Sequence, residues 1–494
     1  MNRFRLLAAS LALASTFTAG CAAARSETRP GDDSARVSDS VATSRTLAGM
    51  ANGAWESTYT PLPSEPTLIE NATIMTAAGE EIESGDVLME NGKIAAVGTG
   101  LTAPAGAVVI DASGRFVTPG IIDTHSHLGV YPSPGVDAHS EGNEATDPTT
   151  PEVWAIHSVW PQDPGFTRAL AGGVTALQIL PGSANLIGGR GVTLKPIPGR
   201  SAQDMMFPGA PMGLKMACGE NPKRVYDDEG PSTRMGNWAG YREAFIQAQK
   251  YRAEWDRWME DGGEKPDRNL ANETLAQVLR GEILVQNHCY RADDMVNMLN
   301  LAKEFGFEVR SFHHAVEAYK IRDYLARESV AASMWTDWWG FKMEAWDMVP
   351  QNIALVSEAG ARAILHTDDD MEIQIMNQGV AHAMVAGRQA GLDVTRDEAL
   401  RWITANPAWA LGLADEIGTL EAGKNGDVVI WSGDPFSVYS HADQVFIDGA
   451  IVYDRLNGVR PVTDFEAGML PPQPGVEPAA AGSGPTGGTG GGRP

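Results

Sequence analysis

The segment Gly120–His127 constrains the fold of this chain more than any other. It is a short apolar run, Gly120-Ile121-Ile122-Asp123-Thr124, that ends in His125-Ser126-His127. Successive side chains of a β-strand point to opposite faces, so His125 and His127 would share one face. Two imidazoles presented together at a strand end can share one divalent ion. For an isolated His-x-His pair, two unrelated surface histidines in a loop are the alternative, and other parts of the chain must decide between the two.

Several other apolar runs also end in an ionisable residue. These runs cover residues 212–215, 283–288, 308–314 and 363–368. In a (β/α)8 barrel each strand delivers side chains at its C-terminal end, and the site forms at that rim. The pattern therefore predicts an α/β fold with a TIM-type barrel. Its candidate strands are residues 116–123, 173–180, 191–195, 212–217, 283–288, 308–313, 330–335 and 363–367.

The order His-x-His, Lys, His, His, Asp along these runs resembles the amidohydrolase superfamily. Within it, the closest likeness is to the imidazolonepropionase-like and prolidase-like metal-dependent hydrolases. The most specific piece is Pro119–His127, and Leu365-His366-Thr367-Asp368 supports it. The resemblance covers residues 66 to 456 and implies a hydrolase barrel over residues 116–410.

Short strand-like runs flank the predicted barrel on both sides, over residues 66–115 and 411–456. An Asn91-Gly92 pair separates two of them, and Asn-Gly is a strong hairpin signal. Neither flank is expected to bury a core alone. We therefore expect one small β-sandwich domain built from both chain ends, which the resemblance also implies.

The resemblance also implies roles for the strand-end residues. His125, His127 and Asp368 would hold one divalent metal ion, most suitably zinc. Asp368 would also take a proton from the attacking metal-activated water and pass it to the leaving nitrogen. His288 and His314 would bind a second metal, or complete a single-metal site and contact the substrate carbonyl.

His314 is preferred over the adjacent His313 as the site residue. The family pattern of His followed by Ala and then Glu-Ala-Tyr matches residues 314–319. The two side chains differ in strand parity, so only one is expected to face the barrel interior.

Lys215 decides between the one-metal and two-metal versions. An ammonium group cannot ligate a cation, but two-metal relatives carboxylate a lysine on the fourth strand to a bridging carbamate. The strand count puts Lys215 on strand four and Lys195 on strand three, so Lys215 is the candidate. A salt bridge from Lys215 to Glu220 or another acid is the alternative. Imidazolonepropionase lacks this lysine, so Lys215 favours the prolidase-like branch.

These residues predict a secreted metal-dependent amidohydrolase that cleaves a C–N bond in a cyclic amide or small peptide. The alternatives are an esterase or phosphoesterase on the same barrel, and a catalytically inactive binding lipoprotein. A net charge of -25 argues against nucleic acid as a partner. A small molecule or small peptide is therefore the expected partner, and homo-oligomerisation is left open.

The N-terminus has the features of an export signal. Arg3 and Arg5 precede the apolar stretch 6–19, which ends in Thr18-Ala19-Gly20-Cys21. This resembles a bacterial lipoprotein processing site, apart from Thr18 where leucine is more usual. We expect a signal peptide over 1–21, lipidation of Cys21, and a protein held in the periplasm or cell envelope by a lipid anchor. Cleavage near residues 22–24 by an ordinary signal peptidase is the alternative.

Three further segments complete the sequence. Residues 22–65 are polar and predict a flexible arm, and residues 471–494 predict a disordered Gly/Pro-rich tail. Residues 221–272 predict a helical insertion whose aromatic side chains serve packing rather than a substrate pocket. Cys218 and Cys289 are expected to be buried free thiols rather than catalytic ones.

Overall fold

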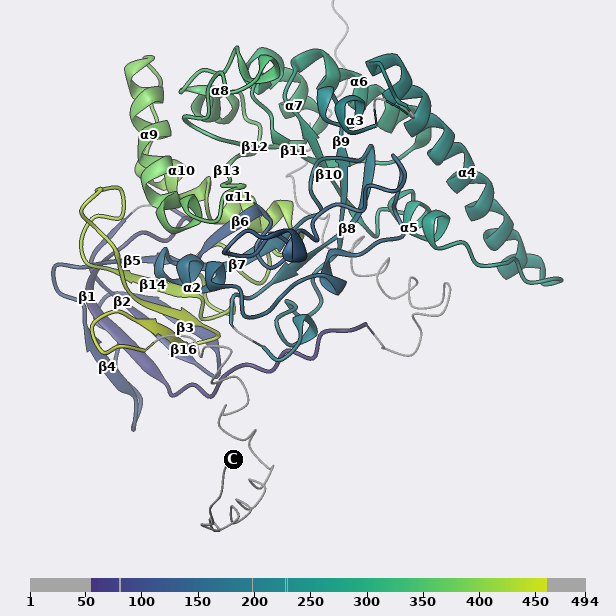
Figure 1. Cartoon of the computed structure of the whole chain (residues 1–494). Coiled ribbons are helices and arrows are strands. Elements are labelled where there is room, and N and C mark those ends of the chain that lie inside the picture. The colour runs from purple at the N-terminus through teal and green to yellow at the C-terminus, as the bar shows by residue number, and fades with distance from the viewer. Residues whose placement is uncertain (1–54, 80, 198, 227, 229, 460–494) are drawn as a thin grey trace, which may run out of the picture.

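The computed structural model describes residues 55–459, except residues 80, 198, 227 and 229. Two sheets of eight strands each organise this part of the chain (Figure 1). The predicted signal peptide with Cys21, the arm up to residue 54 and the tail lie outside the described residues. Within the described residues, no helix is long and apolar enough to cross a membrane.

The first sheet is the barrel, with strand order β13-β12-β11-β10-β9-β8-β7-β6. Each of its strands overlaps a predicted one: β6 (Ile121–Ser126), β7 (Val174–Ile179), β8 (Ile187–Leu194), β9 (Gly213–Ala217), β10 (Leu284–Cys289), β11 (Val309–His314), β12 (Ala331–Met334) and β13 (Ala363–Leu365). Nearly every residue of these strands is buried, because helices and loops cover the outside of the barrel.

One barrel strand departs from the all-parallel pattern of a TIM barrel. β8 runs antiparallel to both β7 and β9, whereas the other neighbouring strands are parallel. A parallel neighbour needs a crossover of a dozen or more residues. Only residues 180–186 separate β7 from β8, so the chain turns back directly.

The two ends of the barrel sheet, β6 and β13, are joined by hydrogen bonds close to the predicted site. The Asp368 N–H donates to the His125 carbonyl oxygen at 3.1 Å. The Thr367 hydroxyl donates to the Asp123 carboxylate at 2.6 Å, and the His125 N–H donates to the same carboxylate at 3.0 Å. Asp123 therefore holds together the two strand ends that carry His125 and Asp368.

The second sheet combines both ends of the described chain, in the order β16-β15-β14-β5-β1-β2-β3, with β4 paired to β1. The purple N-terminal and yellow C-terminal strands lie together in Figure 1. The strands are β1 (Thr67–Ile74), β2 (Ile82–Glu90), β3 (Lys93–Gly98), β4 (Val108–Asp111), β5 (Phe116–Pro119), β14 (Val428–Trp431), β15 (Ala442–Ile447) and β16 (Ala450–Asp454). Asn91 and Gly92 form the predicted hairpin turn, with φ of 52° and 77°.

This sheet corrects one strand prediction and leaves another open. Phe116–Pro119 is not the start of the first barrel strand but β5, which pairs with β1 and β14. The chain bends at Gly120, where any Cβ would collide with the Thr175 side chain. The strands form one continuous sheet around a shared apolar core that includes Ile69, Val117 and Phe446, so a separate two-layer sandwich stays a prediction.

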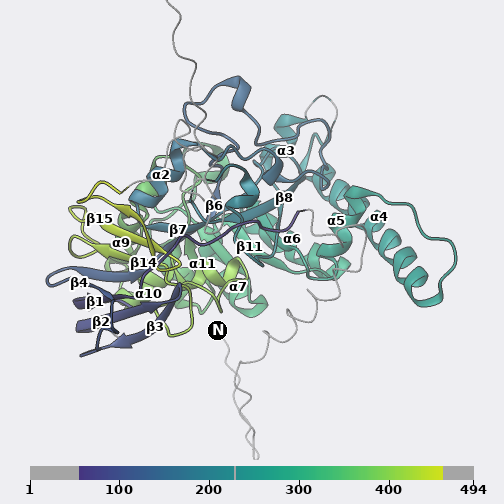
Figure 2. The same ribbon diagram turned by 90° about the horizontal axis from the view of Figure 1, so that it is seen from below.

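Helices surround the barrel and form the insertion after β9. They are α2 (Pro164–Ala171), α3 (Glu220–Val225), α4 (Arg234–Asp261), α5 (Leu270–Val278), α6 (Ala292–Phe305), α7 (Arg322–Glu328), α8 (Asn352–Glu358), α9 (Met376–Gln389), α10 (Arg396–Arg401) and α11 (Ala405–Ala410). α4 projects furthest from the barrel (Figure 2). Its Tyr241, Tyr251 and Trp255 are buried, as the packing interpretation of the insertion predicted.

Candidate metal centre

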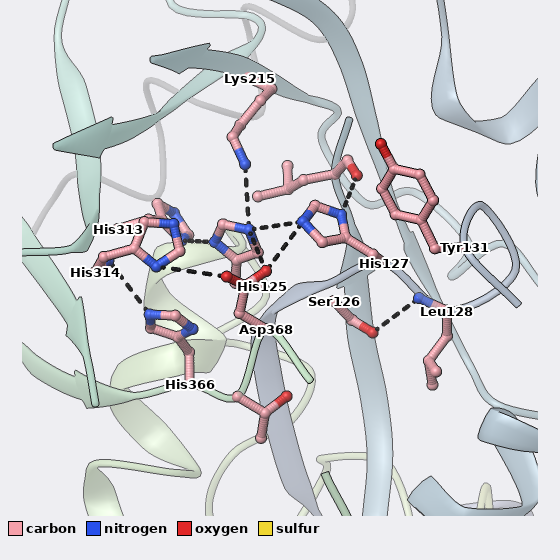
Figure 3. A network of polar contacts seen from close by, with 12 residues as sticks. His125, Ser126, His127, Leu128, Tyr131, Lys215, His313, His314, His366 and Asp368 are labelled. Atoms are coloured by element: carbon pink, nitrogen blue, oxygen red, sulfur yellow. Dashed lines mark hydrogen bonds and ion pairs between the residues drawn. The ribbon is translucent and has the colours of Figure 1, made fainter. Parts of the chain in front are cut away.

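Six of the ten histidines lie together at the C-terminal rim of the barrel. They are His125, His127, His288, His313, His314 and His366. Figure 3 shows most of them, with Asp368, converging on one region. Such a concentration of imidazoles next to a carboxylate is typical of a site for a transition metal.

His125, His127 and Asp368 form the first group of candidate ligands. The Asp368 Oδ1 atom lies 3.0 Å from His127 Nε2 and 3.4 Å from His125 Nε2. The two Nε2 atoms are 3.3 Å apart. The predicted trio therefore presents its ligand atoms to one point, within 4.8 Å of one another.

The orientation of His127 is held by the backbone of the next strand. Its Nδ1 lies 2.8 Å from the Leu180 carbonyl oxygen. Because a carbonyl oxygen only accepts, the single hydrogen of the neutral ring is on Nδ1 in this arrangement, and the neutral ring has a bare Nε2. A bare Nε2 is the form of imidazole that binds a metal.

Lys215 is buried directly beside this group. Its Nζ lies 3.1 Å from His125 Nε2 (Figure 3), and its side chain is 0% exposed. Burial lowers the pKa of Lys215 to about 7, so much of the amine is neutral near that pH. Glu220, the partner of the alternative interpretation, lies 3.7 Å from Lys342 instead.

Lys195 lies elsewhere. It follows the end of β8 and its Nζ is 2.7 Å from Asp448 Oδ1 and 3.8 Å from Asp427 Oδ1. These carboxylates belong to the sheet built from both chain ends. Lys195 is therefore a buried ion-pair residue between barrel and sheet, and it does not reach the histidines.

The second group of histidines has ring nitrogens that form no hydrogen bond with the described residues, although His314 Nδ1 lies 3.8 Å from Asp368 Oδ2. Both ring nitrogens of His288, and Nδ1 of His314 and of His366, have no hydrogen-bond partner among the described residues. The His288 and His314 rings pack edge to face at 4.4 Å. Burial lowers the pKa of all three residues, which keeps them neutral. Unpartnered neutral imidazoles in a buried site fit a metal ion, because it would satisfy their lone pairs.

The parity argument that separated His313 from His314 is wrong. His313 Nδ1 lies 2.9 Å from His125 Nδ1, so His313 also faces the interior. His314 reaches the site because the backbone leaves the extended conformation there, with φ of 67° at His314 and 37° at Ala315. Asp368 has φ of 61° as well. Left-handed backbone at non-glycine residues is typical of functional sites.

The prediction of free thiols is also wrong, since Cys218 and Cys289 form a disulfide with Cα atoms 5.3 Å apart. The bond connects the ends of the neighbouring strands β9 and β10. Cys289 follows His288 directly, and Cys218 lies three residues after Lys215. The disulfide therefore braces the two strand ends that carry these residues.

The site is open on one side and walled by aromatic rings on another. A cavity of about 150 Å³ adjoins His127, Tyr131 and Asp368. The Trp335 and Tyr290 rings stack on His314 at 4.3 and 5.3 Å. A larger groove of about 580 Å³ lies between α4, α5 and residues 147–151, and contains none of these histidines.

Three residues around the site were not identified from the sequence. The parity rule excludes His313 from the site, and the sequence prediction includes neither Gln286, which contacts His313 at 2.8 Å, nor Asp123, which joins the two strand ends. Gln286 shares strand parity with His288 on the same run, and this spacing could have pointed to it.

Comparison with known proteins agrees with this geometry. A family model described as "Amidohydrolase family" matches residues 299–453. The amidohydrolase TasK of Hapsidospora irregularis is 34% identical over 79% of this chain, which spans 43% of the TasK length. An imidazolonepropionase of Sphingopyxis alaskensis is 26% identical, covering 74% of this chain and 91% of that enzyme.

A solved structure is similar over most of this chain. The crystal structure of an amidohydrolase from Thermotoga maritima MSB8 is 37% identical, with a TM-score of 0.73, and covers 79% of this chain and 100% of that one. Identity at this level over a whole relative, together with the barrel and its rim of histidines, means that the chain belongs to the amidohydrolase superfamily.

Proposed function

We propose that this protein is a metal-dependent hydrolase that cleaves a C–N bond in a cyclic amide or a small peptide, as a prolidase does. The observation that carries the proposal is the meeting of Asp368 with bare histidine nitrogens at the barrel rim. The ligand atoms of His125, His127 and Asp368 lie within 4.8 Å of one another, and so do those of His125, His314 and His366.

The reaction needs a stronger nucleophile than water and a positive centre for the developing oxyanion. A divalent ion held by His125, His127 and Asp368 would supply both, by lowering the pKa of a water and polarising the amide carbonyl. Asp368 would accept the water proton as the oxygen attacks the carbonyl carbon. It would then donate that proton to the nitrogen as the C–N bond breaks.

Lys215 supports a site with two metals. A neutral lysine amine can add to CO2 and lose a proton, which gives a carbamate whose oxygens can ligate. The burial of Lys215, which lowers its pKa to about 7, favours that neutral amine. The carbamate oxygens, together with His288 and His314, would hold the second ion.

The size of the site supports a small substrate. The cavity beside His127 and Asp368 has a volume of about 150 Å³, which is below the range of roughly 300–1,000 Å³ for drug-sized ligands. A dipeptide or a cyclic amide would place only its scissile group there. The aromatic rings of Tyr290 and Trp335 would bound it on the other side.

Export to the periplasm or cell envelope, with a lipid on Cys21, is part of the proposal. The leader over residues 1–21 and its Thr18-Ala19-Gly20-Cys21 ending motivate it. The Cys218–Cys289 disulfide supports it, since disulfides persist in oxidising compartments and are rare in the cytosol. Globomycin treatment of cells that express the full chain should leave the unprocessed precursor, and normal processing would contradict lipidation.

Metal analysis tests the catalytic proposal directly. The purified mature protein should contain one or two equivalents of a transition metal, most suitably zinc, by elemental analysis. Hydrolysis of a panel of dipeptides and cyclic amides should stop after chelation and return when zinc is added. A metal-free protein that keeps its activity would rule the mechanism out.

A further inference from the structure

A line of buried hydrogen bonds leads from the barrel interior to the first candidate ligand. It runs from Gln286 through His313 to His125. We propose that Gln286 and His313 are positioning residues that hold His125 in the tautomer whose bare Nε2 faces the metal. This inference rests on the proposed function, because it concerns how that metal site is prepared.

The line begins at Gln286, whose amide orientation is set by two contacts. Its Nε2 donates to the Ala410 carbonyl oxygen at 3.2 Å. Its Oε1 is therefore turned toward His313, where it lies 2.8 Å from the ring Nε2. An amide oxygen only accepts hydrogen bonds, so the hydrogen of His313 must be on Nε2.

His313 passes this constraint to His125. A neutral imidazole carries one hydrogen, so a hydrogen on Nε2 makes Nδ1 of His313 an acceptor. That Nδ1 lies 2.9 Å from Nδ1 of His125, which must then donate. The hydrogen of His125 is thereby held on Nδ1, and its Nε2 is bare.

The bare Nε2 of His125 points to the centre of the site. It lies 3.4 Å from Asp368 Oδ1 and 3.1 Å from Lys215 Nζ. Gln286, His313 and His125 are all 0% exposed. Bulk water therefore does not reach the line, and a lost partner would leave a buried N–H unsatisfied.

The two histidines of the His-x-His motif thus reach the same tautomer by different routes. His127 donates to a backbone carbonyl, that of Leu180, which no substitution removes. His125 depends on the side chains of His313 and Gln286, which can be changed. Partners of this kind typically contribute about 10–100-fold to metal affinity.

The experiment measures zinc affinity of the full chain by competition with a chelator. His313→Phe removes the acceptor and should weaken zinc binding by about 10–100-fold. His313→Asn places an amide oxygen near the position of Nδ1 and should restore most of the affinity. Ser333→Ala is the matched control, because Ser333 is a buried polar residue of the barrel whose hydrogen bonds go to Thr124 and Ser311. It should bind zinc as wild type does.

Gln286→Leu supplies a second, independent readout. Without the amide oxygen, His313 can adopt either tautomer, so zinc binding should weaken but less than in His313→Phe. Combined with His313→Phe it should add nothing, since both changes act through one line. Multiplied losses in the double variant, or a Phe variant that binds zinc as tightly as wild type, would overturn the proposal. If the Phe variant does not fold, weak binding by Gln286→Leu beside near-normal binding by His313→Asn is required.

A measurement without metal separates this inference from the proposed function. In the metal-free wild type with 15N-labelled histidine, the His125 resonances should report a protonated Nδ1 and a bare Nε2. This pattern should be lost in His313→Phe. A wild type that binds no metal would contradict the proposed function alone. The opposite tautomer at His125 would contradict only the inference that Gln286 and His313 set the tautomer of His125.

Discussion

Two buried lysines in neighbouring barrel strands illustrate how differently the two ends of this barrel are built. Lys195 Nζ sits between the Asp448 and Asp427 carboxylates, at 2.7 and 3.8 Å. Lys215 Nζ faces His125 at 3.1 Å and forms no ion pair with any described residue. Both side chains are at most 1% exposed.

The difference lies in what compensates the buried amine. At the junction between barrel and sheet, two acids neutralise Lys195, and Tyr59 donates a further hydrogen bond to Asp448. At the rim, Lys215 has no such partner, and burial lowers its pKa to about 7, so that much of the amine is neutral near that pH. A compensated buried charge contributes to structure, whereas an uncompensated buried amine is available for chemistry.

The largest expected effect is at the rim. Asp368→Asn should reduce turnover of any substrate found by at least about 10²–10⁴, the usual contribution of a general acid–base group. The thermal unfolding midpoint should stay near that of wild type, because Asp368 is at the rim rather than in the core.

Asp369→Asn is the matched control for Asp368. Asp369 only accepts from the N–H groups of Met371 and Glu372, so its substitution should have little effect on turnover. Asp370 is a poorer control, since it pairs with Arg168 at 2.6 Å. Substantial activity in Asp368→Asn with metal bound would mean that Asp368 is not the general acid–base group of the reaction.

Replacing each lysine by alanine in turn tests whether Lys195 and Lys215 have different roles. Lys195→Ala leaves Asp427 and Asp448 buried without their cation and should lower the free energy of unfolding by about 3–5 kcal/mol. Lys215→Ala leaves no carboxylate without its cation, so at pH 7 it should cost much less stability than Lys195→Ala, but it should lose activity. Bicarbonate should help reactivate the metal-free wild type and not this variant. Urea unfolding measures the stability of each variant, and an assay measures its activity. An equal loss of activity in both variants would contradict the assignment of Lys195 to structure and Lys215 to catalysis.

The pH dependence of stability isolates Lys215 in the metal-free protein. Its pKa is about 7 in the folded protein against 10.5 as the ordinary value. Between these values the unfolded chain binds a proton that the folded protein has lost, so the free energy of unfolding rises with pH. The rise should reach roughly 4 kcal/mol between pH 7 and about pH 10.

Lys215→Met should lack this rise, so the difference between wild type and variant is the measured quantity. Below pH 7 both states of wild type are protonated and the difference should be constant. A difference that does not change between pH 7 and 10 would mean that Lys215 is paired after all, like Lys195.

The smallest expected effect concerns the disulfide behind the rim. Replacing Cys218 and Cys289 together by Ser should lower the free energy of unfolding by about 2–4 kcal/mol, because the bond closes a loop across a sequence separation of 71. Urea unfolding under oxidising conditions measures this loss. A double variant as stable as wild type would mean that the two strand ends hold together without the bond.

Local patterns in the sequence were enough to predict much of the barrel. The run before His125 is a buried strand, and its two histidines present Nε2 atoms 3.3 Å apart, as period-two alternation requires. The Asn91-Gly92 turn has the two positive φ angles that such a hairpin needs. The ordered set from His125 to Asp368 also pointed to the correct superfamily.

Expectations that extended a local rule past the end of a strand failed. Alternation put His313 and His314 on opposite faces, but the left-handed backbone at His314 brings both to the site. The run from Phe116 to Asp123 is expected to form one strand, yet it divides between two sheets at Gly120, where Thr175 leaves no room for a Cβ. Parity applies only while the backbone stays extended.

By itself the sequence determined which side chains stand at strand ends, because hydrophobic period and turn residues act over a few positions. Only the tertiary structure decided which side chains from different strands come into contact across the barrel. The Cys218–Cys289 bond, the line from Gln286 to His125, and the separate fates of Lys195 and Lys215 all depend on which strands are neighbours. That adjacency arises from packing between segments far apart in the chain, which no local pattern encodes.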